Sequence, residues 1–219
     1  MSPARQAILE ELQALQVPPL SGNIYAIGRN YRDHALELNN PIPQEPVLFL
    51  KAPSSLRQAA LGPIAYPEES FHHELELVFL LDPKQAAAGW ESVAAVSLGL
   101  DLTRRGVQSQ LKQQGLPWTL AKSFQGAAIV GPWKKLAGRW WQEPIDLNLE
   151  VNGELRQQGS SADMIFDIPT LLQFLRRGQE LEAGDLLFSG TPAGVGPIRQ
   201  GDSFRMRSER LGIDCRGVL

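Results

Sequence analysis

The most constraining stretch of the sequence is Phe71–Leu81, FHHELELVFLL, which has the pattern of a β-strand. Polar and apolar residues alternate from Glu74 to Leu77, and the chain is then apolar up to Leu81. Residues two apart in a strand point to the same face, so Glu74 and Glu76 project together. Two neighbouring carboxylates repel each other and are costly to desolvate unless a cation lies between them. The strand therefore either lies at a solvated edge of a sheet or holds a metal ion.

Composition narrows the class of protein. With 219 residues, of which 43% are hydrophobic, the chain suits one large domain or two small ones. A net charge of −3 gives no reason to expect a nucleic acid or an anionic membrane as partner. The single Cys215 excludes an internal disulfide and a cysteine-based zinc site. No apolar run approaches the roughly 20 residues that span a bilayer, and the N-terminus has no signal-peptide core, so we expect a cytoplasmic protein.

The predicted elements are mostly strands. The apolar periodicity predicts helices near 4–16, 31–38, 103–114 and 168–177. Strands are predicted near 23–27, 47–51, 71–81, 93–100, 145–151, 154–156, 185–189, 203–208 and 212–218, and Pro117–Phe124 is predicted to be extended or looped. Asn152-Gly153 predicts a type I′ hairpin turn. Strands and helices do not alternate regularly, which favours a strand-rich α+β fold over a doubly wound parallel sheet. We expect a helical lead over 1–20 and one catalytic domain over 21–219.

Asp101 is a candidate third carboxylate for a metal site with Glu74 and Glu76. It ends an apolar strand, where a lone carboxylate is often the N-cap of the following helix, so this alternative stays open. Three oxygen ligands would favour a hard cation such as Mg²⁺ or Mn²⁺ over zinc. Such a site keeps open positions that a substrate with two adjacent oxygen atoms could occupy.

His34, Glu37 and Lys122 are candidate proton-handling residues. His34 and Glu37 are three apart and share a face of a helix, where the carboxylate would raise the basicity of the imidazole. The alternative is an exposed surface pair. Lys122 is the single charged residue between Leu116 and Val130, so it either extends toward solvent or lies at a site. The segment 31–44 has the features of a mobile lid, and equally of an ordinary connector.

Two further segments could contact a ligand. Arg105 and Gln108, after Asp101, could face an acidic substrate or be solvated. The segment Gly190–Pro197 contains three glycines and two prolines, so its backbone could approach a ligand closely or form a tight connection between strands.

Six motifs in this order resemble the fumarylacetoacetate hydrolase family, and more narrowly its short, single-domain branch of acylpyruvate hydrolases and oxaloacetate decarboxylases. The resemblance extends from about residue 22 almost to the C-terminus. The motifs are Gly28–Tyr31 with His34 and Glu37, His72–Leu77, Leu100–Thr103, Gly115–Phe124, Val151–Gln157, and Gly190–Pro192 with Gly194–Pro197.

The resemblance implies a mixed β-sandwich roll, a homodimer and a Mg²⁺ or Mn²⁺ site. It implies that Glu74, Glu76 and Asp101 are the metal ligands, that His34 and Glu37 form a base dyad on a lid, and that Lys122 is catalytic. It further implies four substrate-binding residues, namely Arg105, Gln108, Thr191 and Lys51.

The function expected from these features is a divalent-metal-dependent enzyme acting on small 2-oxo acids through a metal-bound enolate. Carbon–carbon hydrolysis of acylpyruvates is the first candidate reaction, and oxaloacetate decarboxylation or tautomerisation would use the same intermediate. One alternative is an isomerase or hydratase of aromatic-degradation intermediates. Another is a non-catalytic β-domain that binds a metal and a carboxylate ligand.

Overall fold

The computed structural model describes residues 3–20, 22–37, 41–61, 70–83 and 89–219. Five α-helices occur in this part of the chain, namely α1 (Pro3–Ala14), α2 (Arg32–Glu37), α3 (Arg105–Gln113), α4 (Thr119–Lys122) and α5 (Ile168–Leu175). The strands are β1 (Ile24–Gly28), β2 (Val47–Lys51), β3 (Leu56–Gln58), β4 (Ser70–His73), β5 (Leu75–Leu81), β6 (Val93–Asp101), β7 (Ala128–Val130), β8 (Lys134–Lys135), β9 (Asp146–Val151), β10 (Glu154–Ser160), β11 (Leu186–Phe188), β12 (Gly196–Arg199), β13 (Ser203–Ser208) and β14 (Ile213–Val218).

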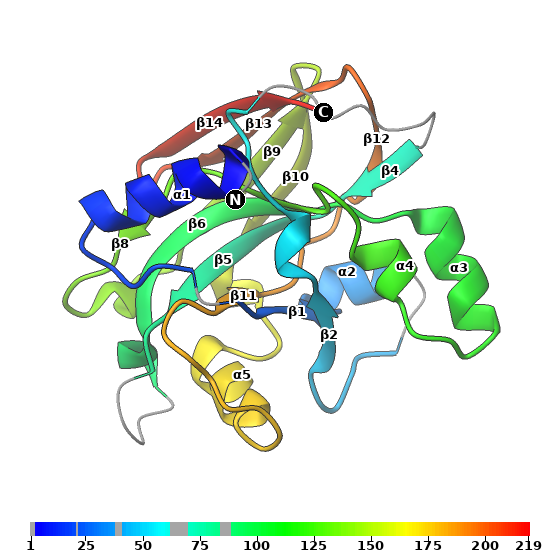
Figure 1. Cartoon of the computed structure of the whole chain (residues 1–219). Coiled ribbons are helices and arrows are strands. Elements are labelled where there is room, and N and C mark those ends of the chain that lie inside the picture. The colour runs from blue at the N-terminus through cyan, green and yellow to red at the C-terminus, as the bar shows by residue number, and fades with distance from the viewer. Residues whose placement is uncertain (1–2, 21, 38–40, 62–69, 84–88) are drawn as a thin grey trace.

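These strands form three sheets (Figure 1). The largest has eight strands in the order β2-β1-β11-β5-β6-β7-β3, with β8 paired to β6. It is mixed, since β1–β11 and β3–β7 are parallel pairs and the other pairs are antiparallel. A second sheet has the order β10-β9-β13-β14, and β12 pairs with β4. The predicted strand-rich α+β class is confirmed. None of the described helices is long and apolar enough to cross a membrane.

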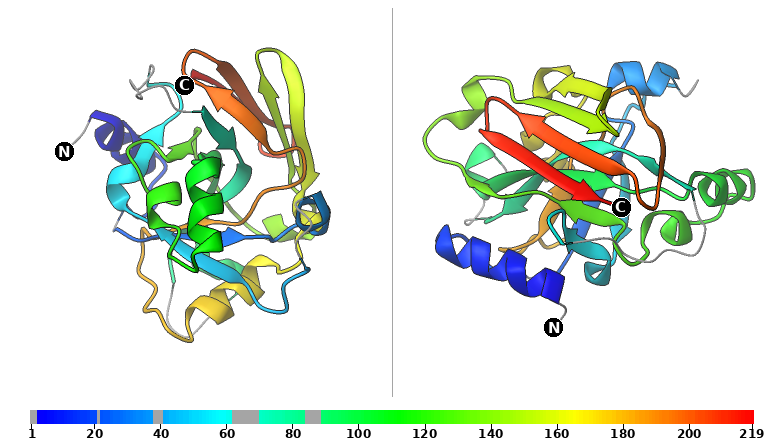
Figure 2. Two further views of the ribbon diagram at one scale, coloured as in Figure 1. Left: turned by 90° about the vertical axis from the view of Figure 1, so that its right-hand side faces the viewer. Right: turned by 90° about the horizontal axis from the view of Figure 1, so that it is seen from above.

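The core lies on both faces of the large sheet, because the apolar run of β5 buries side chains in both directions. Leu77 and Phe79 belong to the larger cluster, which also contains apolar residues of β9, β13 and α5. Val78 and Leu80 point the other way and pack with Ile8 of α1. The four-stranded sheet thus lies over one face of the large sheet, as Figure 2 shows, and α1 contributes to the other. The division of the chain at residue 20 stays a prediction.

The hairpin and the α5 helix follow their sequence signals. Asn152 and Gly153 both have positive φ angles, 53° and 81°, as a type I′ turn requires. Asp167 caps α5 by accepting a hydrogen bond from the backbone N–H of Thr170 at 3.0 Å. Both local predictions are confirmed.

Two local predictions are wrong. The strand predicted over 71–81 is interrupted at Glu74 and forms two strands, β4 and β5. These belong to different sheets, since β5 pairs with β11 and β4 pairs with β12. The segment predicted to be extended or looped after Pro117 contains the short helix α4, which ends at Lys122. A four-residue helix has little stability of its own, and its position between α3 and β2 is set by tertiary contacts that periodicity cannot predict.

Candidate active site

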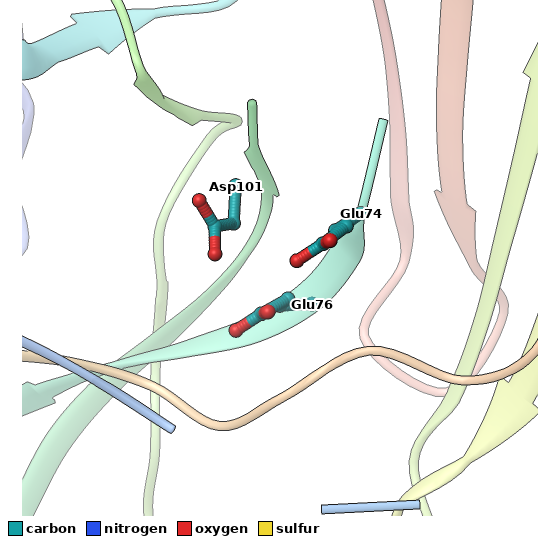
Figure 3. Close-up of side chains that lie close together, drawn as sticks. All are labelled: Glu74, Glu76 and Asp101. Atoms are coloured by element: carbon teal, nitrogen blue, oxygen red, sulfur yellow. The ribbon is translucent and has the colours of Figure 1, made fainter. Parts of the chain in front are cut away.

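Three buried carboxylates converge at one end of the large sheet. Glu74 lies at the junction of β4 and β5, Glu76 lies in β5, and Asp101 ends the neighbouring strand β6. Each offers an oxygen atom that lies within 4.8 Å of the other two, and Figure 3 shows Glu74 and Glu76 projecting side by side next to Asp101. The residues are only 6%, 1% and 0% exposed. The solvated-edge alternative for the Glu74–Glu76 strand is therefore wrong.

Strand register explains this convergence. Glu76 is paired with Gly99, and the Asp101 N–H donates to the Glu74 carbonyl at 2.9 Å. Side chains two residues apart share a face, so Asp101 lies on the same side of the sheet as the two glutamates. Gly99 has no side chain on that face, where an added Cβ would lie 2.6 Å from the carbonyl oxygen of Ile129. Asp101 is thus a strand residue, and the alternative of a helix N-cap is wrong, since Arg104 occupies that position before α3.

Lys122 lies directly on this cluster. Its Nζ atom is 2.6 Å from Glu74 Oε2, 2.6 Å from Asp101 Oδ2 and 2.7 Å from Thr103 Oγ1. The side chain is 3% exposed. Of the two alternatives for Lys122, extension toward solvent is wrong, because the ammonium group is buried among carboxylates. Thr103 was given no role in the sequence, although it lies only two residues after Asp101; it forms an isolated bridge with His72 beyond the end of β6.

Lys51 lies behind Asp101 rather than in the pocket. Its ammonium group is 2.6 Å from Asp101 Oδ1 and donates to the carbonyl oxygens of Lys122 at 2.5 Å and Ala127 at 2.9 Å. Two hydrogen bonds and one ion pair thus hold the buried ammonium group, and Lys51 is not among the residues that border the pocket. The geometry therefore argues against direct contact with a substrate, and gives Lys51 the role of fixing Asp101 and the end of α4.

The electrostatics of the cluster differ between the two glutamates. Burial and the nearby carboxylates of Asp101 and Glu74 raise the pKa of Glu76 well above its ordinary value. Burial would also raise the pKa of Glu74, but the neighbouring cations Lys122 and Arg105 hold that pKa below its ordinary range. Burial opposes the charge of Lys122, yet Asp101 and Glu74 raise its pKa, so the ammonium form is retained.

A divalent cation fits this donor set. The three side chains offer only oxygen ligands, which hard cations such as Mg²⁺ and Mn²⁺ prefer. Lys122, Lys51 and Arg105 pair with Glu74 and Asp101, whereas in the described part of the chain no ion pair reaches Glu76, whose pKa is raised by burial and by the two neighbouring carboxylates. A cation next to Glu76 would remove this repulsion, and the residues present therefore suit the ion.

We expect a pH-dependent stability in the metal-free protein. A carboxyl whose pKa is raised on folding stabilises the folded state below its unfolded pKa of about 4.3. That contribution is lost as the pH rises through the folded pKa. Melting temperatures measured in chelator from about pH 5 to about pH 8 should fall with rising pH in the wild type and less steeply in Glu76→Gln. Equal pH slopes in the two proteins would contradict this reading of Glu76.

His34 and Glu37 form a pair beside the carboxylates. His34 Nδ1 lies 3.1 Å from Glu37 Oε2, and Glu37 Oε1 accepts a hydrogen bond from the backbone N–H of Gly194 at 3.1 Å. His34 is buried and borders the same pocket as Glu74 and Glu76. The alternative of an exposed surface pair is wrong for His34. Residues 38–40 of the predicted lid lie outside the described residues.

Arg105 and Gln108 are adjacent on the first turn of α3 and both border the pocket. The Arg105 guanidinium donates to Glu74 and, at 2.6 Å, to Gln108 Oε1. Because Arg105 can only donate, Gln108 must present its oxygen to the arginine, and its amide N–H₂ group is left for another acceptor.

The remaining pocket wall contains residues that the sequence did not single out as a site. The pocket is bordered by Glu74, Glu76, His34, Lys122, Arg105, Gln108, Thr191, Ile27, Gly28, Arg29, Phe49, Lys112 and Trp118. Lys112 is seven residues after Arg105, a spacing that places both on one helix face and could have indicated it. Arg29 and Trp118 lie within two of the motifs that carry the family resemblance, Gly28–Tyr31 and Gly115–Phe124, although neither was given a role there. Phe49 lies in β2, and no local pattern marks it.

The two adjacent histidines differ in burial. His73 is fully buried and bonds to Gln157, with Nδ1 to Oε1 at 2.9 Å, whereas His72 is less buried. Arg105 Nε lies 3.4 Å from His72 Nδ1. Neither histidine belongs to the cluster of metal-ligating groups in the described residues.

Glu74, Glu76 and Lys122 thus border one pocket together with His34 of the histidine–glutamate pair. Residues 23–218 match the family described as fumarylacetoacetate (FAA) hydrolase C-terminal. The chain belongs to the fumarylacetoacetate hydrolase family, as its motifs indicated, and it is an enzyme of that family. The alternative of a non-catalytic binding domain is therefore wrong.

Three relatives illustrate the range of the family. Oxaloacetate tautomerase FAHD1, mitochondrial, from Bos taurus is 41% identical over 192 residues, covering 84% of this chain and 85% of its own. The crystal structure of fumarylpyruvate hydrolase from Pseudomonas aeruginosa in complex with Mn²⁺ and pyruvate is 31% identical, with a TM-score of 0.81 and coverage of 92% and 90%. A 5-carboxymethyl-2-hydroxymuconate delta-isomerase from Mycobacterium smegmatis is 30% identical, with a TM-score of 0.74 and coverage of 92% and 80%.

These relatives support the expected fold and a small-molecule substrate. The homodimer stays a prediction. The cytoplasmic location also stays a prediction, since the bovine relative is named as mitochondrial.

Proposed function

We propose that this protein is a Mg²⁺- or Mn²⁺-dependent enzyme that acts on small 2-oxo acids, with keto–enol tautomerisation of oxaloacetate as its first activity. The observation that supports this most is the convergence of Glu74, Glu76 and Asp101 on one buried point beside Lys122. The similarity to oxaloacetate tautomerases over most of both chains moves this reaction ahead of acylpyruvate hydrolysis, which the sequence placed first.

The metal would be held by Glu74, Glu76 and Asp101. When bound, such an ion supplies Lewis-acid stabilisation for the adjacent carboxylate and carbonyl oxygens of a 2-oxo acid. Lys122 holds Glu74 and Asp101 in place through contacts of 2.6 Å, and it adds positive charge where negative charge develops on the substrate. Arg105 and the free amide of Gln108 would bind the remaining carboxylate oxygens of the substrate.

His34 would transfer the proton. Glu37 accepts from Nδ1, which leaves Nε2 as the basic nitrogen of the neutral ring. In tautomerisation, His34 Nε2 removes a proton from C3 of the keto acid, and a proton is added to the C2 oxygen to give the enol. The reverse transfer regenerates the keto form, so no atom is gained or lost.

Hydrolysis of an acylpyruvate is the second candidate, favoured by the same dyad and by the likeness to a fumarylpyruvate hydrolase. Here His34 removes a proton from water, and the hydroxide adds to the C4 carbonyl. The C3–C4 bond then breaks, its electron pair forms pyruvate enolate, and a carboxylic acid is released. C3 is finally protonated to give pyruvate. An isomerase reaction on a related dienoate is a third member of the same class, as in the mycobacterial relative.

The direct test is a panel of 2-oxo acids followed by ultraviolet absorbance of their enols, with Mg²⁺ or with chelator. We expect metal-dependent interconversion of oxaloacetate enol and keto forms, and a smaller rate of acetylpyruvate cleavage. No metal-dependent change with either compound would contradict the proposed function.

His34→Ala should separate the reactions. General acid–base catalysis typically contributes about 10²–10⁴ in rate, so tautomerisation and acylpyruvate hydrolysis should both fall at least about a hundredfold. Oxaloacetate decarboxylation forms the enolate by loss of CO₂ without a base, and should fall about tenfold or less. Glu37→Gln should show a weaker form of the same pattern. Equal losses in all three reactions would count against His34 as the base.

A further inference from the structure

Gln157 is a buried residue outside the pocket wall that connects two parts of the site. It lies in β10, is 1% exposed, and follows a register shift between β10 and β9. Its side-chain amide reaches the start of β5 on one side and the loop after β11 on the other. Four groups surround it, namely the Leu75 N–H at 2.9 Å, His73 Nδ1 at 2.9 Å, Thr191 Oγ1 at 2.7 Å and the Pro192 carbonyl at 3.0 Å.

The two backbone partners fix the orientation of this amide. The Leu75 N–H can only donate, so the atom facing it is the oxygen Oε1. The Pro192 carbonyl can only accept, so the atom facing it is the nitrogen Nε2. His73 must then donate from Nδ1, because Oε1 has no hydrogen. A flipped amide would place Nε2 against the Leu75 N–H and Oε1 against the Pro192 carbonyl, and neither hydrogen bond could then form.

This orientation also determines the direction of the Thr191 hydroxyl. Nε2 has two hydrogens; one bonds to Pro192, and the other points to Thr191 Oγ1 at 2.7 Å. Thr191 therefore accepts from Gln157, and its own hydrogen is left to donate elsewhere. Thr191 is 3% exposed and borders the pocket with Glu74, Glu76 and Lys122. In the part of the chain that the structure describes, no hydrogen bond uses that hydrogen.

We infer that Gln157 is a positioning residue that makes the Thr191 hydroxyl an obligate hydrogen-bond donor toward an oxygen atom of the bound substrate. The substrate class, a small 2-oxo acid anion, rests on the proposed function. An anionic oxygen is the acceptor that such a fixed donor suits best, because hydrogen bonds to charged groups are stronger than neutral ones. A preorganised hydroxyl also avoids the entropy of reorienting when the ligand binds.

Oxalate, an unreactive dianion with adjacent carboxylates, is the probe, and its affinity is measured by calorimetry in the presence of Mn²⁺. Thr191→Ser keeps the hydroxyl and should bind oxalate within about threefold of the wild type. Thr191→Val removes the donor and should weaken binding about 10- to 100-fold. Gln157→Glu keeps the acceptor for Leu75 but turns the other atom into an acceptor. The Thr191 hydroxyl then donates to the introduced carboxylate instead of the ligand, and binding should weaken to a similar extent.

The combination of the two substitutions separates positioning from general structural support. If Gln157 acts through Thr191, adding Gln157→Glu to Thr191→Val should lower oxalate affinity by no more than about a further threefold. If the losses of oxalate affinity in Gln157→Glu and Thr191→Val simply add in the double variant, the inference is overturned. It is also overturned if Gln157→Glu binds oxalate as tightly as the wild type. Should Gln157→Glu fail to fold, Gln157→Met replaces it. Gln157→Met should lower oxalate affinity less than Gln157→Glu, and it should cause no further loss when combined with Thr191→Val. The matched control, Gln158→Glu on the neighbouring exposed residue, should leave oxalate affinity unchanged.

Failure of this inference and failure of the proposed function give different results. If no 2-oxo acid is turned over but oxalate affinity follows the pattern above, the positioning role holds and the reaction assignment is wrong. If oxaloacetate is turned over but the Thr191 and Gln157 variants bind oxalate like the wild type, the reaction assignment holds and the positioning role is wrong. A wild type that does not bind oxalate would overturn the inference.

Discussion

Replacing Glu76 by glutamine is expected to lower metal-dependent kcat/KM by about three orders of magnitude or more while the fold stays intact. Glutamine has nearly the same shape, and its amide oxygen can still accept the 2.8 Å hydrogen bond from the Gly190 N–H. What it removes is one of the three negative charges that the proposed metal site offers to a cation. Because the pKa of Glu76 is raised by burial and by its neighbours, losing that charge should not destabilise the metal-free protein.

The Glu76→Gln prediction is measured by enol absorbance with saturating Mg²⁺ or Mn²⁺, together with the melting temperature in chelator. Glu154→Gln is a suitable control, since Glu154 is exposed and forms only a surface pair with Arg156. Full activity in Glu76→Gln would mean that the three carboxylates are not the metal site. A large fall in the melting temperature of the metal-free variant would instead show that Glu76 is charged and stabilising there.

Lys122→Met should damage both stability and activity. The substitution leaves Glu74 and Asp101 buried without the ammonium group that lies 2.6 Å from each. Removing one partner of a buried ion pair typically costs about 3–5 kcal/mol, so the metal-free variant should unfold at a clearly lower denaturant concentration. Lost electrostatic stabilisation of the substrate should reduce kcat at least about a hundredfold.

Added Mn²⁺ gives the Lys122→Met experiment a second readout. A divalent cation at the carboxylates would replace part of the missing positive charge, so Mn²⁺ should restore more stability to Lys122→Met than to the wild type. Lys135→Met, at an exposed lysine, should change neither stability nor activity appreciably. An equal Mn²⁺ effect on wild type and Lys122→Met would contradict the shared location of the lysine and the metal.

Local patterns predicted the centre of the site well. The period-2 alternation around Glu74 and Glu76 and the position of Asp101 at a strand end are properties of single strands. Once β5 and β6 pair, their register alone brings the three carboxylates together, and no contact with a distant segment is needed. The Asn152-Gly153 hairpin and the Asp167 cap were predictable for the same reason, since each depends on residues a few positions apart.

Contacts between distant segments were not predictable from periodicity. Lys51 and Lys122 both follow apolar residues, yet Lys122 borders the pocket whereas Lys51 lies behind Asp101, a difference that arises from the packing of β2 against α4. Gln157 bonds to His73, 84 residues earlier, and to Thr191, 34 residues later. The interruption of the strand at Glu74 likewise depends on β12, which is distant in sequence.

The proposed metal site is tested most directly by anomalous diffraction, recorded at the manganese absorption edge, from crystals grown with Mn²⁺ and pyruvate. We expect one strong manganese peak among the carboxylate oxygens of Glu74, Glu76 and Asp101, with pyruvate beside it and within reach of Lys122 and the Thr191 hydroxyl. A peak at any other place in the molecule, or crystals of active protein with no manganese at these three residues, would contradict it.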